Sequence, residues 1–382
     1  MQKVYITGSA IMSALGNHKT EAINSIKNIN DSNYNSYLEH NFRSKDFYRI
    51  NKEFATQHEK FYSILETVVK DAIADAKLSE EETKDLHIFL GSTSMSISIN
   101  EEKNLDFLNN ITDEKIHEIG YGNIGNFVEE LIQTKHKSTL IQSACTSSAN
   151  AFSHAVNMIK NKKIKKALVI GLELFNNATY QGFNSLMLLS QSGEYQPFDK
   201  NSDGLILGES CSAVILDINK ISENSFECLS SNSSFDNHSV TNSNPNGTIS
   251  FECMRDAISK ADISLKDITC LKAHATGSQI SNLSEARAID KLFRHFNCEV
   301  DVTVLKPFIG HTLGACGTSE IVLLCECIKN GFIPKTFGFN NKYDEISFSP
   351  LEVTKKTNKA TLLFNYIGFG GSNHSIILRN EK

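Results

Sequence analysis

The stretch "STLIQSACTSSANAF", residues 138–152, changes character at one point. An apolar run with β-branched residues gives way to small polar residues, and apolar side chains then recur at helical spacing. This pattern predicts a strand, a tight turn and a helix over residues 147–159, with Cys145 at or just before the helix N-terminus. Backbone N–H groups and the helix dipole there favour a thiolate, so Cys145 is a candidate nucleophile. The alternative is an ordinary small core residue.

Strand-to-helix units of this kind recur along the chain. Short β-branched runs end in small residues, as in "LHIFLGSTS" (86–94) and "ALVIGLELF" (167–175), and helical patterns separate several of them. This alternation predicts an α/β protein with a largely parallel sheet. A polar stretch at 222–248, interpreted as a connector or surface segment that could contain one strand, precedes a restart of the pattern. We therefore expect two duplicated α/β halves, 1–221 and 222–382.

Composition restricts the class of protein. The 382 residues include 40% hydrophobic residues, enough for a sizeable core, and the net charge of −6 gives no support for general nucleic-acid binding. Nine scattered cysteines without a CxxC pair predict reduced thiols, no metal site and a cytoplasmic protein. The N-terminus does not read as a signal peptide, and no apolar stretch approaches the roughly 20 residues of a membrane span.

Two histidines follow apolar runs in the second half. His274 lies in "LKAHATGS" and His311 in "KPFIGHTLGACG", each before small residues that suit a tight turn at a strand end. Ligands of open α/β sheets bind at the carboxyl ends of strands, so both rings are candidates for the same site as Cys145. Neutral imidazoles beside a thiol can accept a proton or stabilise developing negative charge. A lone histidine is, however, more often structural.

Lys306 lies in the same turn as His311, at the end of an apolar run. A buried lysine needs a partner, and Glu285, on the helix that follows His274, is a plausible one. The alternative is a solvated lysine at the strand end.

The segment "YIGFGGSNHSIIL", residues 366–378, contains a glycine-rich loop. Gly368, Gly370 and Gly371 allow unusual backbone angles around Phe369. A phosphate loop is a poor interpretation because no Lys-Ser/Thr pair is present and a strand follows the loop. A mobile loop that carries an aromatic gate fits the pattern better.

Taken together, these stretches resemble the elongating β-ketoacyl-acyl carrier protein synthases of the thiolase superfamily. The resemblance covers nearly the whole chain through an ordered set of motifs: "SACTSSANAF", "QPFDKNSDGLILGES", "AHATGS", "KPFIGHTLGACG" and "GFGG". It implies the thiolase fold, an α/β arrangement of two duplicated βαβαβ-type halves in five αβαβα layers. The first half would carry the nucleophile and the second half the histidines, the lysine and the glycine-rich gate.

The resemblance also implies roles for the catalytic residues. Cys145 would accept the acyl chain, while His274 and His311 would serve malonyl decarboxylation and stabilise the enolate and the thioester oxyanion. Lys306, paired with Glu285, would organise the histidines.

Substrate-binding roles follow from the same resemblance. Phe369, flanked by Gly368 and Gly370, would be the gate, and its backbone N–H would form an oxyanion hole with that of Cys145. Phe183, in "QGFNSLMLLS", matches an aromatic residue near the acyl tunnel.

The implied reaction is a decarboxylative Claisen condensation. An acyl chain held on Cys145 would react with malonyl-acyl carrier protein to give a β-ketoacyl product, with no cofactor because decarboxylation supplies the driving force. The partners would be acyl and malonyl carrier proteins, together with a second copy of the chain or a related ketosynthase-like chain. The family's dimers suggest that "ALVIGLELF" pairs across a two-fold axis.

Several positions depart from the family's pattern. Ala275 replaces a glycine, Asn282 an aspartate, Gln196 an arginine and Pro307 a small polar residue, and Met187 stands where many members carry an arginine for carrier docking. These departures favour a specialised pathway, such as polyene or polyketide synthesis, over housekeeping fatty-acid elongation. They also leave two alternatives open: a non-condensing subunit that resembles a chain-length factor, and a Cys-dependent acyltransferase that does not decarboxylate.

Overall fold

The computed structural model describes residues 2–41, 43–44, 47–112, 120 and 122–380. Ten of its strands form one sheet in the order β11-β10-β14-β15-β9-β1-β8-β6-β4-β5. The strands of the first half are β1 (Tyr5–Ser13), β4 (His87–Gly91), β5 (Thr139–Ile141), β6 (Lys166–Glu173) and β8 (Ser210–Asp217). Those of the second half are β9 (Phe226–Phe235), β10 (Cys270–Lys272), β11 (Asp301–Thr303), β14 (Thr361–Ile367) and β15 (Ser372–Asn380).

The two halves of the sheet repeat one topology. When the five strands of each half are numbered in chain order, their order across the sheet is 1-5-4-2-3, counted from the middle of the sheet outward. In each half the first two pairings are antiparallel and the next two are parallel. This match confirms the predicted duplication, whereas the expectation of a largely parallel sheet was wrong. The turn at 368–371 shows one reason, because so short a connection can join β14 to β15 only as an antiparallel pair.

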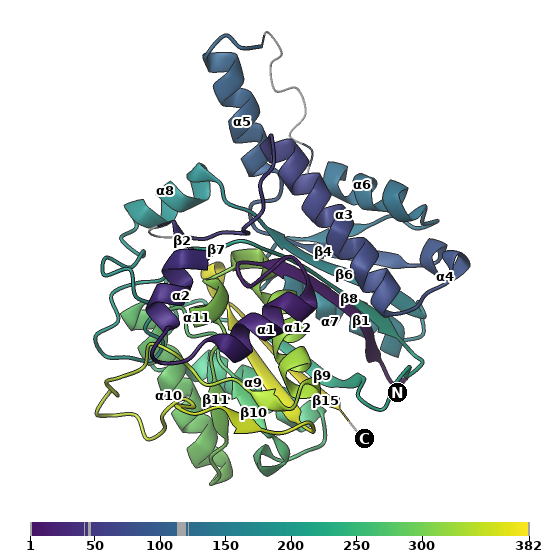
Figure 1. The fold of residues 1–382 in the computed structure, drawn as a ribbon. Helices are drawn as coiled ribbons and strands as arrows, with labels where there is room; N and C mark the ends of the chain where they lie inside the picture. The colour runs from purple at the N-terminus through teal and green to yellow at the C-terminus, as the bar shows by residue number, and fades with distance from the viewer. Residues whose placement is uncertain (1, 42, 45–46, 113–119, 121, 381–382) are drawn as a thin grey trace.

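Helices and half-sheets alternate in five layers (Figure 1). Helices α3 (Gln57–Asp75) and α6 (Gly122–Ile132) cover the outer face of the first half-sheet, and α9 (Thr248–Lys260) and α10 (Gln279–Phe296) that of the second. Between the half-sheets lie α7 (Ser147–Lys160) and α12 (Cys316–Lys329). Alternate residues of a strand serve different layers: Val169 of β6 packs in the middle core, and Leu168 and Ile170 pack in the outer core that also contains residues of α3. The predicted thiolase fold is thereby confirmed.

Helix α12 is the most enclosed of these helices. Every residue from Cys316 to Ile328 is buried, glutamates included, which is typical of a helix at the centre of a large core. The smaller helices and strands complete the described chain: α1 (Lys19–Asn28), α2 (Tyr34–Asn41), α4 (Glu80–Lys84), α5 (Ile97–Leu108), α8 (Asn177–Ser185), α11 (Lys306–Ile309), β2 (Arg43–Ser44), β3 (Phe47–Tyr48), β7 (Leu207–Gly208), β12 (Phe332–Ile333), β13 (Lys355–Lys356) and three 3₁₀ turns. In the part of the chain that the structure describes, no helix has the length and apolarity to cross a membrane.

The structure corrects two expectations about strands. The polar stretch 222–248 contains one strand, as the sequence allowed, but this strand, β9, is no surface segment because it lies near the middle of the sheet, between β15 and β1. Its serines are compatible with burial because their hydroxyls bond to neighbouring groups, as Ser230 Oγ does to Ala257 O at 2.6 Å. The segment "ALVIGLELF" does not offer an edge for a two-fold partner, since β6 is paired on both sides, and the edge strands of this sheet are β5 and β11.

Candidate active site

Cys145 lies in the turn between β5 and α7, as the sequence predicts. Ala144 adopts a left-handed φ of 49°, and Thr146 occupies the N-cap of α7, so the thiol projects from a sharp turn at the start of the helix. The helix can sit here because Gly91 of β4 has no side chain: a Cβ at this position would lie 2.4 Å from the backbone nitrogen of Ser148. Close packing of β4 against α7 therefore helps to place Cys145, which is buried.

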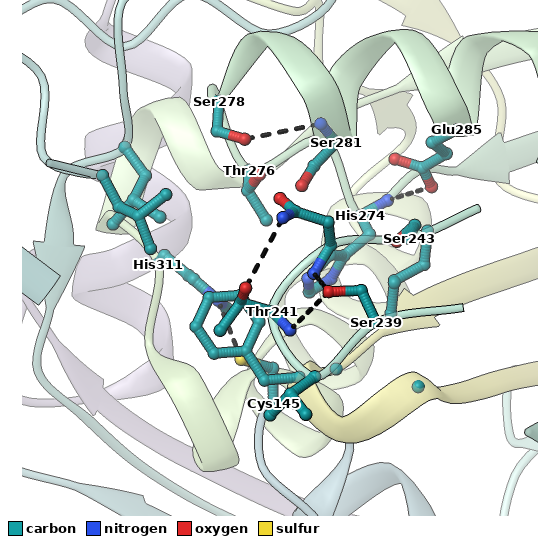
Figure 2. A pocket seen from close by; sticks show the side chains of 18 of the residues that line it. Cys145, Ser239, Thr241, Ser243, His274, Thr276, Ser278, Ser281, Glu285 and His311 are labelled. Atoms are coloured by element: carbon teal, nitrogen blue, oxygen red, sulfur yellow. Dashed lines mark hydrogen bonds between the residues drawn. The ribbon is translucent and has the colours of Figure 1, made fainter. Parts of the chain in front are cut away.

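His311 is the direct neighbour of the thiol. It follows α11 and Gly310, whose φ of 71° turns the chain. The backbone N–H of His311 donates to Ile206 O at 2.7 Å, and its Nε2 atom lies 3.2 Å from Cys145 Sγ (Figure 2). The arrangement allows the imidazole to exchange a proton with the thiol.

His274 lies edge-to-face against His311, with ring centroids 5.2 Å apart. Two hydrogen bonds to Glu285 hold its backbone, from His274 N to Oε1 (2.7 Å) and from Ala275 N to Oε2 (2.6 Å). The ring's Nδ1 lies 3.2 Å from Lys306 Nζ, and within the described chain its buried Nε2 has no hydrogen-bond partner. Because an ammonium can only donate, Nδ1 is the acceptor and the neutral ring carries its proton on Nε2. The residue itself is one of those that line the pocket.

The structure corrects the partner of Lys306. Its Nζ is fully buried, as expected, but it pairs with Glu320 of α12, with Oε1 at 2.6 Å. The carboxylate of Glu285 is occupied instead by the two backbone amides and by Asn365 Nδ2 at 2.7 Å. Glu285 thus holds the loop of His274, whereas Glu320 pairs with the lysine.

Burial keeps both imidazoles uncharged. It holds the pKa of His274 and of His311 well below the usual value, and the nearby charge of Lys306 acts in the same direction. Burial opposes the charge of Lys306 as well, but attraction to Glu320 outweighs it and leaves the pKa of the lysine raised. The site therefore combines two neutral imidazoles with one firmly charged ammonium behind them.

Cys145 is not a resting thiolate, contrary to the expectation from its place at a helix N-terminus. Burial raises the pKa of the thiol to about 12, against the favourable charge of Lys306, and Glu173 adds to the increase. The backbone N–H groups of Phe369 and of Cys145 itself act on the sulfur in the opposite direction. Desolvation outweighs these favourable contacts, so the thiol would need a base to react as a nucleophile.

The glycine-rich loop forms one wall of the pocket. The Phe369 ring stacks on that of Phe183 at 5.6 Å, and both line the pocket with Gly368. Gly370 is exposed and does not line it, and its N–H donates to Val240 O at 2.7 Å. Three of the four predicted substrate-binding residues therefore face the pocket.

One wall of the pocket consists of polar residues that were not predicted from the sequence to bind substrate. Its hydroxyl groups come from two segments, and Figure 2 draws them above and in front of the thiol. They belong to Ser239, Thr241, Ser243, Thr276, Ser278 and Ser281. The buried Thr276 Oγ1 has no hydrogen-bond partner within the described chain, so a ligand could supply one. The motif "AHATGS" signals the second segment, but nothing local marks 239–243 as a pocket wall.

No metal site emerges from the described residues, since no group of three or more His, Cys, Asp or Glu side chains is arranged to hold an ion.

Comparison with known proteins places this site in a family. The sequence model of the β-ketoacyl synthase N-terminal domain matches residues 22–220, more than half of the chain, and that of the C-terminal domain matches residues 226–340. The chain belongs to the β-ketoacyl synthase family. A 3-oxoacyl-[acyl-carrier-protein] synthase 2 from Coxiella burnetii is 27% identical over 72% of this chain and 71% of its own.

Other relatives are longer than this chain. It spans 60% of a protein from Schizosaccharomyces pombe named as a mitochondrial 3-oxoacyl-[acyl-carrier-protein] synthase and 10% of a non-reducing polyketide synthase from Hypocrea jecorina. Among solved structures, that of a type II polyketide acyl-carrier protein with its ketosynthase matches with a TM-score of 0.84, at 18% identity over 99% of both chains. A ketosynthase with its chain length factor from Xenorhabdus doucetiae matches with a TM-score of 0.82, at 19% identity over 99% of this chain and 98% of that one.

Proposed function

We propose that the chain is a condensing acyltransferase, a β-ketoacyl-acyl carrier protein synthase. Cys145 takes an acyl group from a carrier thioester, and malonyl-acyl carrier protein then extends it by two carbons with loss of CO₂. One observation carries the proposal: Cys145 Sγ, with His311 Nε2 at 3.2 Å, shares a pocket with His274, whose Nε2 has no partner among the described residues. The site thus holds a nucleophile, a base and a separate donor for an oxyanion.

The first step is acyl transfer to the thiol. Nε2 of His311 takes the proton from Cys145 as Sγ attacks the thioester carbonyl. The carbonyl oxygen becomes negative and accepts hydrogen bonds from the backbone N–H groups of Cys145 and Phe369. The carbon–sulfur bond to the carrier breaks, and the departing thiolate recovers the proton from His311.

The second step is decarboxylative condensation. The thioester oxygen of the malonyl group accepts a hydrogen bond from Nε2–H of His274. The bond to the carboxylate breaks, CO₂ leaves, and the electron pair forms an enolate whose negative oxygen this donor stabilises. The enolate carbon attacks the acyl carbonyl on Cys145, and the carbon–sulfur bond breaks. Because His311 has already returned its proton to the carrier thiolate, the departing Sγ regains a proton from solvent. Lys306 holds Nδ1 of His274 and so keeps the proton on Nε2.

The partners follow from the substrates. We place acyl and malonyl carrier proteins at the pocket mouth, and a second copy or a related ketosynthase-like chain beside this one. The carrier complex and the chain-length-factor complex of the structural neighbours support this part of the proposal. Nine unpaired cysteines, eight of them buried, support a reducing compartment such as the cytoplasm.

A single incubation tests the proposal. The protein is mixed with acyl- and malonyl-acyl carrier protein, and mass spectrometry follows Cys145 acylation and CO₂ release. We expect both, with acylation lost in Cys145→Ala. Acylation without CO₂ release would indicate a transferase that does not condense. Activity that needs a partner chain, with no acylation of this one, would indicate a non-condensing subunit.

A further inference from the structure

A second lysine is buried beside the site. Lys272, at the end of β10 and two residues before His274, is fully buried. Its Nζ contacts Glu320 Oε2, donates to Asn365 O at 2.9 Å and lies 3.7 Å from the centroid of the Tyr366 ring. An ammonium has three N–H donors, and these three acceptors match them. The geometry therefore suits a charged lysine, although burial opposes the charge and lowers the pKa of Lys272.

The contacts of Lys272 close a ring of hydrogen bonds around His274. On one side, Lys272 and Lys306 hold the two oxygens of Glu320, and Lys306 reaches Nδ1 of His274. On the other side, Asn365 accepts from Lys272 through its backbone oxygen and donates from Nδ2 to Glu285, which accepts the backbone N–H of His274. Hydrogen bonds thus hold His274 through both its imidazole and its backbone.

The charges of this network balance only when Lys272 is included. Two carboxylates, Glu285 and Glu320, are almost completely buried, and Lys306 can neutralise one of them. Without the ammonium of Lys272, the cluster would carry an uncompensated negative charge, which is costly in a low-dielectric interior.

We infer that Lys272 is a positioning residue: it closes the ring and balances the second carboxylate, so that Lys306 stays directed at Nδ1 of His274 and the proton stays on Nε2. The inference rests on the proposed function, because Nε2–H of His274 is the donor that the condensation step uses. It adds a residue that contacts neither the thiol nor the pocket.

The charged groups around His274 determine what loss of Lys272 does. Lys306 faces the ring from α11, His311 meets its edge, and the carboxylates of Glu285 and Glu320 approach from α10 and α12. Cys145, neutral at rest, shares the pocket. Burial, Lys306, His311 and Lys272 all lower the pKa of His274. Removal of one of these positive charges therefore raises that pKa, and it frees Lys306 to turn toward Glu320 alone.

NMR of ¹⁵N-histidine-labelled protein tests the inference without any catalysis. The signals of His274 are assigned by their loss in His274→Asn, and spectra are recorded from pH 5 to pH 8. In the wild type we expect a neutral ring with the proton on Nε2. In Lys272→Met we expect a mixture of tautomers and an imidazolium that appears at a higher pH. The same tautomer and the same titration in both proteins would overturn the inference.

Three further variants keep this test decisive. Lys272→Gln keeps a donor without the charge and serves if the methionine variant does not fold, with the same expected shift and the same contrary outcome. Lys272→Met/Glu320→Gln restores the charge balance and should return the titration toward the wild type. Lys60→Met removes a different buried lysine, paired with Glu209, and should leave His274 unchanged. An equal shift in Lys60→Met would assign the effect to general destabilisation and refute the role of Lys272.

The pH profile of malonyl decarboxylation supplies the second readout. In Lys272→Met the acid limb should move to higher pH, because the ring must be neutral to act, while Cys145 loading changes less than about twofold. A wild type that neither loads nor decarboxylates would refute the proposed function, yet the NMR titration would still decide the role of Lys272.

Discussion

The Sγ atom of Cys145 and the Nε2 atom of His311 lie 3.2 Å apart, although 166 positions separate the two residues in the chain. Both groups are neutral at rest, because burial raises the pKa of the thiol to about 12 and holds the pKa of the imidazole well below its usual value. A neutral thiol is a poor nucleophile, so loading must couple proton transfer to attack.

The reactivity of Cys145 should therefore rise steeply with pH. The folded-state pKa of the thiol lies above the usual value, so the thiolate fraction grows about tenfold per pH unit between pH 7 and pH 9. Alkylation by iodoacetamide, followed at the Cys145 peptide by mass spectrometry, should show this slope. A rate that levels off below pH 8 would contradict a raised pKa. The Cys145→Ala variant serves as the control for labelling elsewhere.

Substitution of His274 and substitution of His311 should affect acyl loading and decarboxylation differently. His274→Ala removes the donor that faces the malonyl thioester but leaves the pair of Cys145 and His311. We expect near-normal acyl loading and a loss of decarboxylation of about 10²- to 10³-fold. His311→Ala should slow both steps, since it removes the base at 3.2 Å from the thiol. Single-turnover loading and CO₂ release measure the two steps. Equal losses of loading in both variants would refute this division.

The corrected ion pair makes a prediction about stability. Glu320→Gln leaves two buried ammonium groups, Lys272 and Lys306, without their shared anion, and should cost about 3–5 kcal/mol. Glu285→Gln removes acceptor capacity from hydrogen bonds to backbone amides and should cost about 1–3 kcal/mol. Urea unfolding at pH 7 compares them. If Glu285→Gln proved the more damaging change, the assignment of Glu320 as the partner of the lysines would fail.

Sequence patterns place Cys145 well because its position is set locally. Cys145 is set by a strand, a turn and a helix that adjoin one another, and the helix begins at Ser147 as predicted. The partner of Lys306 could not be found in this way, because Glu320 lies on a separate helix whose approach depends on packing between the half-sheets. Glu285 looked suitable because it lies on the helix that follows His274, but backbone amides occupy its carboxylate.

The direction of neighbouring strands and the burial of β9 were also not predicted from the sequence. A period-2 apolar pattern signals a strand but not the direction of its neighbours, which depends on connection lengths. In β9, buried polar residues such as Ser230 and Asn232 replace the apolar residues that would have marked an interior strand. Their partners, Ala257 O and Cys253 O, belong to α9 and are invisible in the local sequence.

The close approach of β4 to α7 yields a last prediction. In Gly91→Ala the new Cβ would meet the backbone of Ser147 and Ser148 at 2.4–2.5 Å, and this helix backbone cannot yield without moving Cys145. We expect a loss of about 1–3 kcal/mol in unfolding free energy and slower acyl loading. Gly182→Ala is the matched control: it lies in the exposed helix α8 with nothing within 4 Å of its Cβ, so it should stabilise by about 0.5–1 kcal/mol. Urea unfolding and Cys145 loading, measured on both variants, give the comparison. Normal loading in a stable Gly91→Ala protein would show that α7 does not depend on this contact to place the nucleophile.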